Sequence, residues 1–528
     1  MWLEIQKFAP LSPQSTGELL NRHTSQTLAA DQPACAPPDT GYRSGMSLPR
    51  LSDRTLAQAR NGVWPAAYDR SAVRVGVVHL GPGAFHRAHQ APVFDKLLQG
   101  DPRWGVCGIS LRSAAVREAL APQDGLYALA LLDAEARVRI VGSVMELITA
   151  PATPGLVIQR LAAAGTRLIT LTVTEKGYCL TPGGELDLAH PEIAADVARP
   201  GEPRSAVGWL AAGLRARRAG GAPAVSVISC DNLTGNGGKL GRAVLALVRA
   251  QGDADLAAWI QGEVAFPTTM VDAITPATDD ALRARVAEAI GLEDSWPIQR
   301  ERFSQWVLED RLAPGAPDLA GAGVELAADV RPFEQAKLRL LNGAHSTLAY
   351  LGLLAGLETV AEAMAEPALA GFVERLMRAD IAPSLPPTAG LALGAYIDSI
   401  LSRFRNPAIR HLLAQIAWDG SQKLPFRLLG TIADALAAGR PVQRLGAPVA
   451  AWMLFAARRA SGAEPLVDPL AERIDAIAKA PTEQQPGLFL ALGAVFPAAI
   501  ATDERFRGAV VGAHRALAGG RMAEVLAL

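Results

Sequence analysis

The stretch FEQAKLRLLNGAHS, residues 333–346, places four polar side chains in an otherwise apolar helical pattern. Glu334, Lys337, Asn342 and His345 are costly to bury unless they are paired. A lysine in apolar surroundings has a pKa below its ordinary value of about 10.4, so it can exchange a proton near neutral pH. An asparagine amide can donate to an oxyanion, and a histidine can orient a neighbouring hydroxyl. These residue types indicate general acid–base chemistry at the wall of a site.

The spacing of these residues predicts how they surround a ligand. A regular helix turns about 100° per residue, which puts Lys337 about 80° from His345 and about 140° from Asn342. They do not form one stripe, but they can enclose a substrate that leans against the helix. Glu334 lies three residues before Lys337, on the same side, where it can hold or relay the lysine's proton.

Each of these residues also has a simpler explanation. Glu334 and Lys337 could be an exposed helix pair, and His345 could be a core histidine with satisfied hydrogen bonds. Asn342 followed by glycine could end the helix, although the helical pattern AHSTLAYLGLL continues beyond it.

The elements that must position this helix begin near residue 72. Short apolar runs alternate with helical stretches such as 91–98 and 206–218, which predicts βαβ units and a parallel sheet. The four clearest strand-like runs are VRVGVVHLGPG, WGVCGISL, RLITLTVTE and AVSVISCDN. Each run ends in polar residues or glycine: the first at Gly81, the third at Glu175, and the fourth at Asp231 and Asn232. Ligands of open α/β sheets bind beyond these carboxyl ends, so chemistry is expected there.

The first of these runs ends in half of a dinucleotide fingerprint. Gly81 and Gly83 could form a tight turn that lets a pyrophosphate approach a helix N-terminus, but His86 occupies the third glycine position. Phe85, His86 and Arg87 then open a helix, where they could bind phosphate or pair across a domain interface.

The cofactor's phosphate preference stays open at this stage. An acidic residue at the end of the second strand would bind the adenosine ribose, but Ser110, Leu111 and Arg112 stand there. NAD is expected, and NADP is not excluded.

The chain divides into three parts by composition and hydrophobic periodicity. Residues 1–45 are polar and proline-rich, which predicts a disordered segment or a spurious N-terminal extension. Residues 46–330 carry the strand–helix alternation, and 331–528 have helical spacing throughout. The fold class expected is therefore α/β, with an N-terminal Rossmann-type dinucleotide-binding domain and a mostly α-helical C-terminal substrate domain.

Composition narrows the class of protein. The 528 residues have a formal net charge of −1, which favours neither a nucleic-acid partner nor an anionic membrane. No run is long and apolar enough for a membrane span, and no C-x-x-C pair or zinc-ligand spacing occurs, so no metal is expected. The expectation is a cytoplasmic protein, a monomer or weak oligomer, whose cysteines are reduced: Cys35, Cys107, Cys179 and Cys230.

Several segments together resemble the polyol-specific long-chain dehydrogenase family, which includes mannitol 2-dehydrogenases and fructuronate and tagaturonate reductases. They are VHLGPGAFHRAHQAPVFD, LTVTEKGY, SCDNLTGNG, FPTTMVDAITPAT, QWVLED and KLRLLNGAHSTLAYLG. The family pattern K-x4-N-x2-H is matched at Lys337, Asn342 and His345. The resemblance implies zinc-independent hydride transfer between a nicotinamide and a secondary alcohol or ketone of a sugar derivative, with Lys337 as general acid and base.

The resemblance also assigns residues outside the central helix. It implies that Asn232 contacts the reactive oxygen, that Glu175 gates proton exchange with water, and that Asp272 lies near the nicotinamide or the substrate. Lys423 matches a substrate-site lysine of the family. The usual family sequence MVDR reads MVDA here, so Ala273 leaves the pairing of Asp272 in doubt.

Within the family the chain is most similar to the fructuronate reductases, chiefly through the segment QIAWDGSQKLP. Gln415 stands in it where some mannitol dehydrogenases have an arginine. The substrate expected is the D-mannonate/D-fructuronate pair, and a neutral polyol such as mannitol or arabinitol is the alternative. A sugar acid needs an additional cation, for which Arg405, Arg410 and Lys423 are candidates. A non-catalytic nucleotide-binding protein is a remote third possibility.

Overall fold

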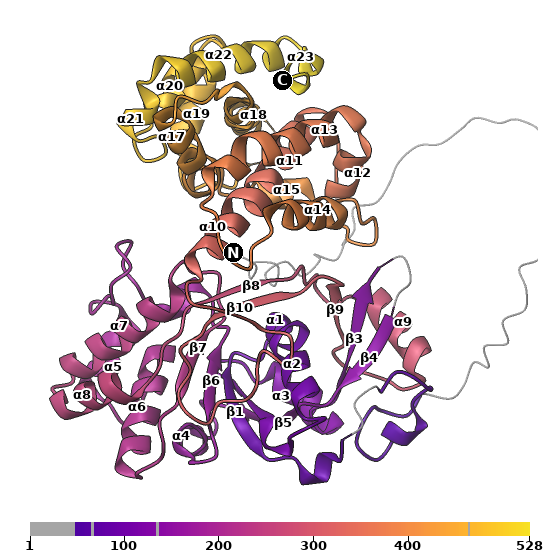
Figure 1. Ribbon diagram of the computed structural model, residues 1–528, viewed down its shortest axis with the longest axis vertical. Coiled ribbons are helices and arrows are strands. Elements are labelled where there is room, and N and C mark those ends of the chain that lie inside the picture. The colour runs from indigo at the N-terminus through magenta and orange to yellow at the C-terminus, as the bar shows by residue number, and fades with distance from the viewer. Residues whose placement is uncertain (1–47, 65–67, 134–136, 463–464) are drawn as a thin grey trace, which may run out of the picture.

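The computed structural model describes residues 48–64, 68–133, 137–462 and 465–528, arranged as an α/β lobe below a helical lobe (Figure 1). The N-terminal extension expected over 1–45 lies outside the described residues. Strands occur up to Ala327, and the described elements from Arg331 onward are helices. The expected combination of a Rossmann-type domain with a helical C-terminal region is confirmed.

The main sheet of the α/β lobe has five parallel strands in the order β5-β2-β1-β6-β7. Its strands are β1 (Val75–Leu80), β2 (Gly105–Ser110), β5 (Val144–Thr149), β6 (Leu168–Leu171) and β7 (Ser226–Ser229). Strands β2, β6 and β7 are buried throughout and β1 is buried apart from its first residue, which explains why these four read as continuous apolar runs. Half of the residues of β5 are buried. The strand order reverses between β1 and β6, so a switch point lies where Gly81 follows β1.

Two three-stranded sheets, which the sequence reasoning did not anticipate, complete this lobe in the orders β4-β3-β9 and β11-β10-β8. Their strands are β3 (Tyr127–Leu132), β4 (Arg137–Val141), β8 (Thr269–Asp272), β9 (Ile298–Glu301), β10 (Gln305–Glu309) and β11 (Glu325–Ala327). Strands β8, β9 and β10 lie at the top of the lobe, facing the helical lobe (Figure 1).

Helices pack on both faces of the main sheet. One face is covered by apolar residues of α4 (Pro154–Ala162), α6 (Ala206–Ala219), α7 (Asn236–Ala250) and α8 (Ala254–Glu263). The other face packs against α2 (Gln90–Leu97) and strands β8 and β10. The remaining helices of the lobe are α1 (Ala84–Ala88), α3 (Ala115–Leu120), α5 (Pro191–Ala198) and α9 (Asp280–Ile290).

The helical lobe is built around two long buried helices, α11 (Gly343–Leu354) and α18 (Gln443–Ala460). Around them pack α10 (Arg331–Ala336), α12 (Val360–Ala365), α13 (Pro367–Arg375), α14 (Leu393–Phe404), α15 (Leu413–Ala417), α16 (Gly420–Leu424), α17 (Gly430–Ala437), α19 (Ala471–Ala478), α20 (Gln485–Leu490), α21 (Ala498–Ala501), α22 (Glu504–Ala518) and α23 (Met522–Leu526). No helix in the described ranges combines the length and apolarity needed to cross a bilayer.

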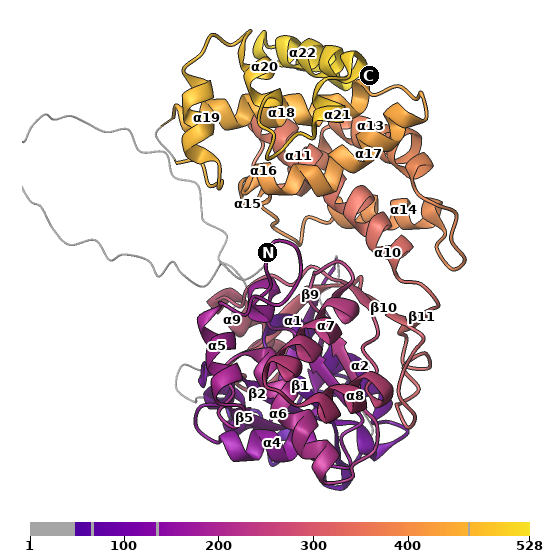
Figure 2. The ribbon, with the colours of Figure 1, turned by 90° about the vertical axis from the view of Figure 1, so that its left-hand side faces the viewer.

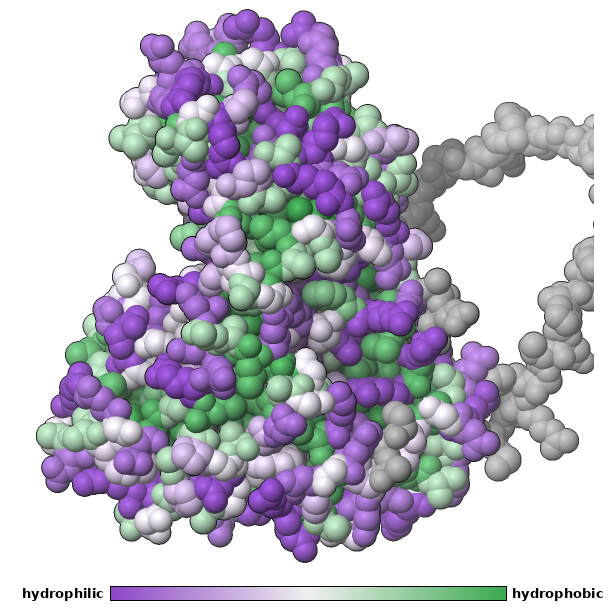
Figure 3. Space-filling view, in the orientation of Figure 1, coloured by the Kyte–Doolittle hydropathy of each residue, from purple (hydrophilic) through white to green (hydrophobic). Residues whose placement is uncertain are grey.

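In the described residues of the helical lobe there are three π-helical turns: η7 (Lys337–Asn342), η8 (Leu376–Ile381) and η10 (Pro425–Leu429). Single π turns are rare and often occur at functional sites. Helix α10 connects the two lobes (Figure 2). It leads directly into η7, whose first residue is Lys337. The space-filling view narrows at the same level, where apolar side chains gather (Figure 3).

Candidate active site

The loop after β1 requires glycine at its first position. Gly81 has a φ of +86°, and a Cβ there would lie 2.3 Å from the carbonyl oxygen of Thr172, which follows β6. At Gly83 a Cβ would meet only the Gly81 carbonyl oxygen, at 3.9 Å, so this position is open. The loop therefore passes close to β6 at the switch point and exposes bare backbone just before α1.

The structure does not present His86 and Arg87 to a phosphate, contrary to one reading of the sequence. Both are buried. The His86 ring stacks on His79 of β1 with a centroid separation of 3.5 Å. Arg87 donates to the Trp296 carbonyl oxygen and lies 4.8 Å from the centre of that residue's ring. These side chains turn into the interior of the α/β lobe because α1 packs against β9.

Two other predicted cofactor residues stay at accessible positions. Phe85 is partly exposed and stacks on His89 at 5.0 Å between ring centres. Arg112 is exposed just after β2 and pairs with Glu192 at 2.7 Å. It lies where the adenosine ribose is expected in a Rossmann fold.

A buried carboxylate organises the ends of β6 and β7. Asp231 accepts hydrogen bonds from the backbone N–H groups of Val173 and Thr174 and from the Tyr178 hydroxyl. This network ties together the segments that carry Glu175 and Asn232. Glu175 is exposed at the start of a short 3-10 helix, and Asn232 lies at the junction of the lobes.

Lys337 reaches from the helical lobe to this edge of the α/β lobe. Its Nζ donates to Asn232 Oδ1 at 2.7 Å and to the Val271 carbonyl oxygen at 2.6 Å. Burial lowers the pKa of Lys337, the nearby Asp272 charge opposes that change, and the net direction is downward. Lys337 and Asn232, two of the candidate site residues, are therefore in direct contact.

The π-helical turn changes the geometry expected for this wall. Lys337 and Asn342 are the first and last residues of η7, and hydrogen bonding from residue i to i+5 replaces the regular helical pattern there. Two residues that are five apart in sequence are separated by a smaller angle around the axis of a π turn than around that of an α-helix. The separation of about 140° between Lys337 and Asn342, derived for a regular helix, is therefore too large. The helix continues into α11, which excludes a helix end at Asn342.

Glu334 does not hydrogen-bond Lys337 in this structure. Its Oε1 accepts from the Gly235 N–H at 3.0 Å, and its buried Oε2 has no partner among the described residues. Burial raises the pKa of Glu334, which favours a protonated carboxyl more than at the surface. Its charge still acts on Lys337, so a relay role remains a proposal.

Arg403 is a residue of this region that sequence reasoning missed. From α14 it pairs with Asp272 and with Glu301 of β9, each at 2.7 Å, and its guanidinium lies 4.1 Å from the centre of the Phe303 ring. Burial raises the pKa of Asp272, but Arg403 outweighs this and holds it below its usual value. The pairing left in doubt by Ala273 is thus supplied by the other lobe. The sequence showed only an arginine on a helical face.

His345 lies on α11 just beyond the π turn. Its ring is buried 4.4 Å from Phe404 and 5.0 Å from His411, measured between ring centres. Burial lowers the pKa of His345 well below its ordinary value, and the charges of His411 and Arg427 add to this effect. The ring is therefore neutral at physiological pH and can accept or donate a hydrogen bond.

The candidate substrate cations differ in their surroundings. Lys423 is buried, and its Nζ donates to the Ile416 carbonyl oxygen at 3.1 Å. Arg410 is exposed and pairs with Glu358 at 2.6 Å, and Arg405 is also exposed. The structure thus brings Lys423 into the buried region of the helical lobe and leaves Arg410 and Arg405 at the surface. Arg427, which was not a candidate, lies one helical turn after Lys423.

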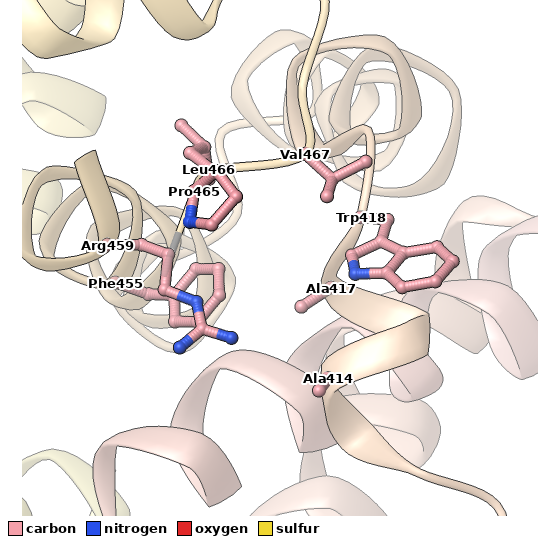
Figure 4. Close-up of a pocket in the computed structure, with 8 residues that line it drawn as sticks. All are labelled: Ala414, Ala417, Trp418, Phe455, Arg459, Pro465, Leu466 and Val467. Atoms are coloured by element: carbon pink, nitrogen blue, oxygen red, sulfur yellow. The ribbon is translucent and has the colours of Figure 1, made fainter. Parts of the chain in front are cut away.

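A small cavity in the helical lobe does not belong to this constellation. Its volume is about 20 Å³, about enough for one water molecule. Ala414, Ala417 and Trp418 line one side, and Phe455 and Arg459 lie across from them (Figure 4). It is too small for a sugar.

One group of possible metal ligands lies elsewhere in the α/β lobe. Donor atoms of Cys179, His190 and Glu192 lie within 4.8 Å of one another. His190 already accepts the Glu192 N–H, and Glu192 is paired with Arg112. His190 and Glu192 thus already have protein partners.

Comparison with known proteins agrees with this geometry. Residues 75–321 match the mannitol dehydrogenase Rossmann domain, and residues 329–518 match the mannitol dehydrogenase C-terminal domain. D-mannonate oxidoreductase of Escherichia coli is 40% identical over 88% of this chain and 97% of its own length. Mannitol 2-dehydrogenase of Phaeosphaeria nodorum is 36% identical over 95% and 88%.

Two solved structures are also similar. Pseudomonas fluorescens mannitol 2-dehydrogenase, in a ternary complex with NAD and D-mannitol, has a TM-score of 0.77 and 36% identity, covering 90% of this chain and 99% of its own. A substrate-free D-sorbitol dehydrogenase has a TM-score of 0.84 and 31% identity, covering 90% and 100%.

Proposed function

This chain belongs to the mannitol dehydrogenase family and is an oxidoreductase acting on CH–OH groups, and we propose that it interconverts D-fructuronate and D-mannonate with NAD(H). Lys337 is the general acid and base of this proposal. The observation that carries it is the Lys337 amine, bound to Asn232 and to the Val271 carbonyl oxygen beside the carboxyl edge of the sheet.

The residues present fit a nicotinamide dinucleotide. Gly81 and Gly83 expose backbone at the switch point, and a side chain at Gly81 would collide with Thr172. Gly81, Gly83, Phe85 and Arg112 are the residues proposed to hold the cofactor, which supplies or accepts the hydride when bound. Preference for NAD over NADP belongs to the proposal, and Arg112, which would meet a ribose 2′-phosphate, is the feature that would favour NADP instead.

The two bonds of Lys337 explain how it can act as a base. A neutral amine has two N–H groups and one lone pair. If both N–H groups point at Asn232 Oδ1 and the Val271 carbonyl oxygen, the lone pair points away from them, toward an alcohol. Protonation adds a third N–H in that direction, which can donate to the developing alkoxide during ketone reduction. Burial lowers the pKa of Lys337, which favours the neutral amine more than at the surface.

Neighbouring residues complete the proposed proton chemistry. Asn342 ends the π turn that begins at Lys337 and can donate its amide N–H to the reacting oxygen. The neutral His345 ring, whose buried Nε2 has no partner among the described residues, can orient an adjacent substrate hydroxyl. Glu334 and the exposed Glu175 are proposed to exchange the lysine's proton with water.

A neutral polyol remains the second candidate substrate. Mannitol 2-dehydrogenases are among the relatives, and one similar structure holds D-mannitol. The sugar-acid proposal is favoured by the 40% identity with D-mannonate oxidoreductase and by a buried cation at Lys423. A cytoplasmic protein that is a monomer or weak oligomer is part of the same proposal.

Initial rates with the purified full-length protein test this function. D-fructuronate and D-fructose are each supplied with NADH and with NADPH, and nicotinamide absorbance is followed. Reduction of fructuronate with NADH supports the proposal, and turnover of fructose alone would reassign the protein to polyol oxidation. Unchanged turnover in Lys337→Ala would contradict the mechanism and show that Lys337 has no catalytic role.

A further inference from the structure

Two cations of the helical lobe lie on one face without a carboxylate between them. Lys423 is in α16, Arg427 is in η10, and the two elements form a continuous helix in which residues four apart are neighbours. Like charges at this spacing destabilise a helix. Neither residue forms an ion pair within the described part of the chain. The repulsion between the two positive charges is relieved only when an anion binds to them.

The hydrogen bonds of the pair leave donors free. Lys423 donates to a backbone carbonyl oxygen, and Arg427 Nη1 donates to Ser346 Oγ at 3.0 Å. A guanidinium has five N–H donors, and Arg427 uses only this one among the described residues. Its other nitrogens are not among the buried polar atoms that lack partners, so they reach accessible space.

The surrounding carboxylates compensate the charge of the pair only in part. Burial lowers the pKa of Lys423 to about 7, with Arg427 as the next cause, while Asp419 and Asp468 oppose the change more weakly. Asp468 already accepts from the backbone N–H and the hydroxyl of Ser421. Burial also lowers the pKa of Arg427 to about 10.

The pair lies beside the reacting groups. Turn η10 packs against η7, which carries Lys337 and Asn342. A Cβ at Gly343 would lie 3.0 Å from the Arg427 carbonyl oxygen, so the two backbones approach closely. The hydroxyl that binds Arg427 belongs to Ser346, next to His345, and the Arg427 charge lowers the pKa of both His345 and Lys337.

We propose that Arg427, together with Lys423, binds the carboxylate of a sugar-acid substrate. This inference rests on the proposed function and names the residues that would select an acid over a neutral sugar. In D-fructuronate the carboxylate lies toward the opposite end of the carbon chain from the ketone, so a ketone at Lys337 leaves the carboxylate free to reach a second site. The planar guanidinium matches a carboxylate in a paired hydrogen-bonding geometry, and Lys423 adds a point charge.

The first experiment compares Arg427→Met and Arg427→Lys with the unmodified full-length protein. The readout is the ratio of kcat/KM for D-fructuronate to kcat/KM for D-fructose at saturating NADH. Loss of the guanidinium is expected to lower this ratio about 100-fold or more, mainly through KM for fructuronate, with Arg427→Lys intermediate. A ratio within about twofold of the unmodified protein in Arg427→Met would overturn the inference.

A matched control keeps the result interpretable. Arg378 also lies in a π turn, η8, but it is bound to Glu374 and Asp398 at the surface. Arg378→Met is expected to leave the substrate ratio unchanged. NADH binding, followed by its fluorescence, should be unchanged in each variant, since the predicted cofactor residues lie in the other lobe.

Inhibition separates failure of this inference from failure of the proposed function. If the unmodified protein reduces fructose and not fructuronate, the proposed reaction is wrong. D-mannonate is then added as a competitor of fructose. Competition that is lost in Arg427→Met would still support a carboxylate site, whereas absence of competition in the unmodified protein would overturn it.

Discussion

Arg403 and Arg427 both project from the helical lobe toward the region of Lys337, but their surroundings are opposite. Arg403 forms ion pairs with Asp272 and Glu301 of the α/β lobe, and these carboxylates raise its pKa even though burial alone would lower it. Arg427 has a hydroxyl as its partner, and burial lowers its pKa to about 10. One arginine is neutralised by the protein, and the other is not.

This difference separates a structural role from a ligand-binding one. A buried arginine whose donors are all used by carboxylates joins two lobes, whereas one with free donors and no counter-charge is arranged for a partner that arrives later. Lys337 responds to both regions, since Asp272 raises its pKa while Arg403 and Arg427 lower it. The charges of a neutralised cation and of an unpaired one therefore both act on the reacting amine.

Removing the amine between the two regions is expected to have the largest effect. Lys337→Ala eliminates proton transfer and should lower kcat about 10²–10⁴-fold, with little change in NADH binding. Steady-state kinetics and NADH fluorescence measure the two quantities. A kcat within about threefold of the unmodified enzyme would show that another group transfers the proton.

Arg403→Met should cost far more stability than Arg427→Met. It leaves two buried carboxylates unpaired, for which about 3–5 kcal/mol of unfolding free energy is expected. Arg427→Met removes no ion pair and should cost less than about 1 kcal/mol. Urea unfolding of both variants measures the difference, and equal losses would remove the distinction between the two arginines.

Lys423 should make stability depend on pH. Its folded pKa of about 7 is below its unfolded value of 10.5, so the unfolded state binds more protons between these limits and stability rises with pH there. Lys423→Met removes this dependence, so the variant should be more stable than the unmodified protein near pH 7 and similar above pH ~10.5. Thermal unfolding across this range tests the sign, and parallel curves would contradict it.

Asp272→Asn should give a smaller and more local effect. Loss of the carboxylate charge removes the main influence that raises the pKa of Lys337, so that pKa should fall further. The pH at which alcohol oxidation reaches half its maximum should then move downward. The matched change Glu301→Gln, on the far side of Arg403, should move this limb less. Arg403, released from its partner, is also expected to lower the pKa of Lys337. An upward shift of the limb in Asp272→Asn would contradict this prediction.

Much of this architecture could be predicted from the sequence because it depends on local patterns. Buried parallel strands appear as apolar runs, and residues at their ends meet at one edge. This reasoning placed Asn232 at a strand end, where the structure has it bound to Lys337, and it correctly indicated a helical second lobe. It was wrong about the angle between Lys337 and Asn342, because periodicity assumes a regular helix and does not reveal a π turn.

The remaining errors concern which neighbours a side chain meets. His86 and Arg87 were candidates for binding phosphate. Helix α1 instead packs against β9, which is remote in sequence, and both side chains are buried, with Arg87 bound to the Trp296 carbonyl oxygen. Arg403, Arg410 and Arg427 are alike in sequence, each lying in a helical or loop segment rich in apolar residues. Only the packing shows that one is neutralised, one is at the surface and one has free donors.

The sequence by itself determined the apolar runs that form the strands, the glycine turn, and the spacing of Lys337, Asn342 and His345 along the chain. These features depend on residues that are neighbours in sequence. The tertiary structure alone decided where charge is compensated. Electrostatic free energy depends on distances between groups that are remote in the chain and on how far each is withdrawn from water. That is why the candidate base was visible in the sequence, while its setting between Arg403 and Arg427 required the folded molecule.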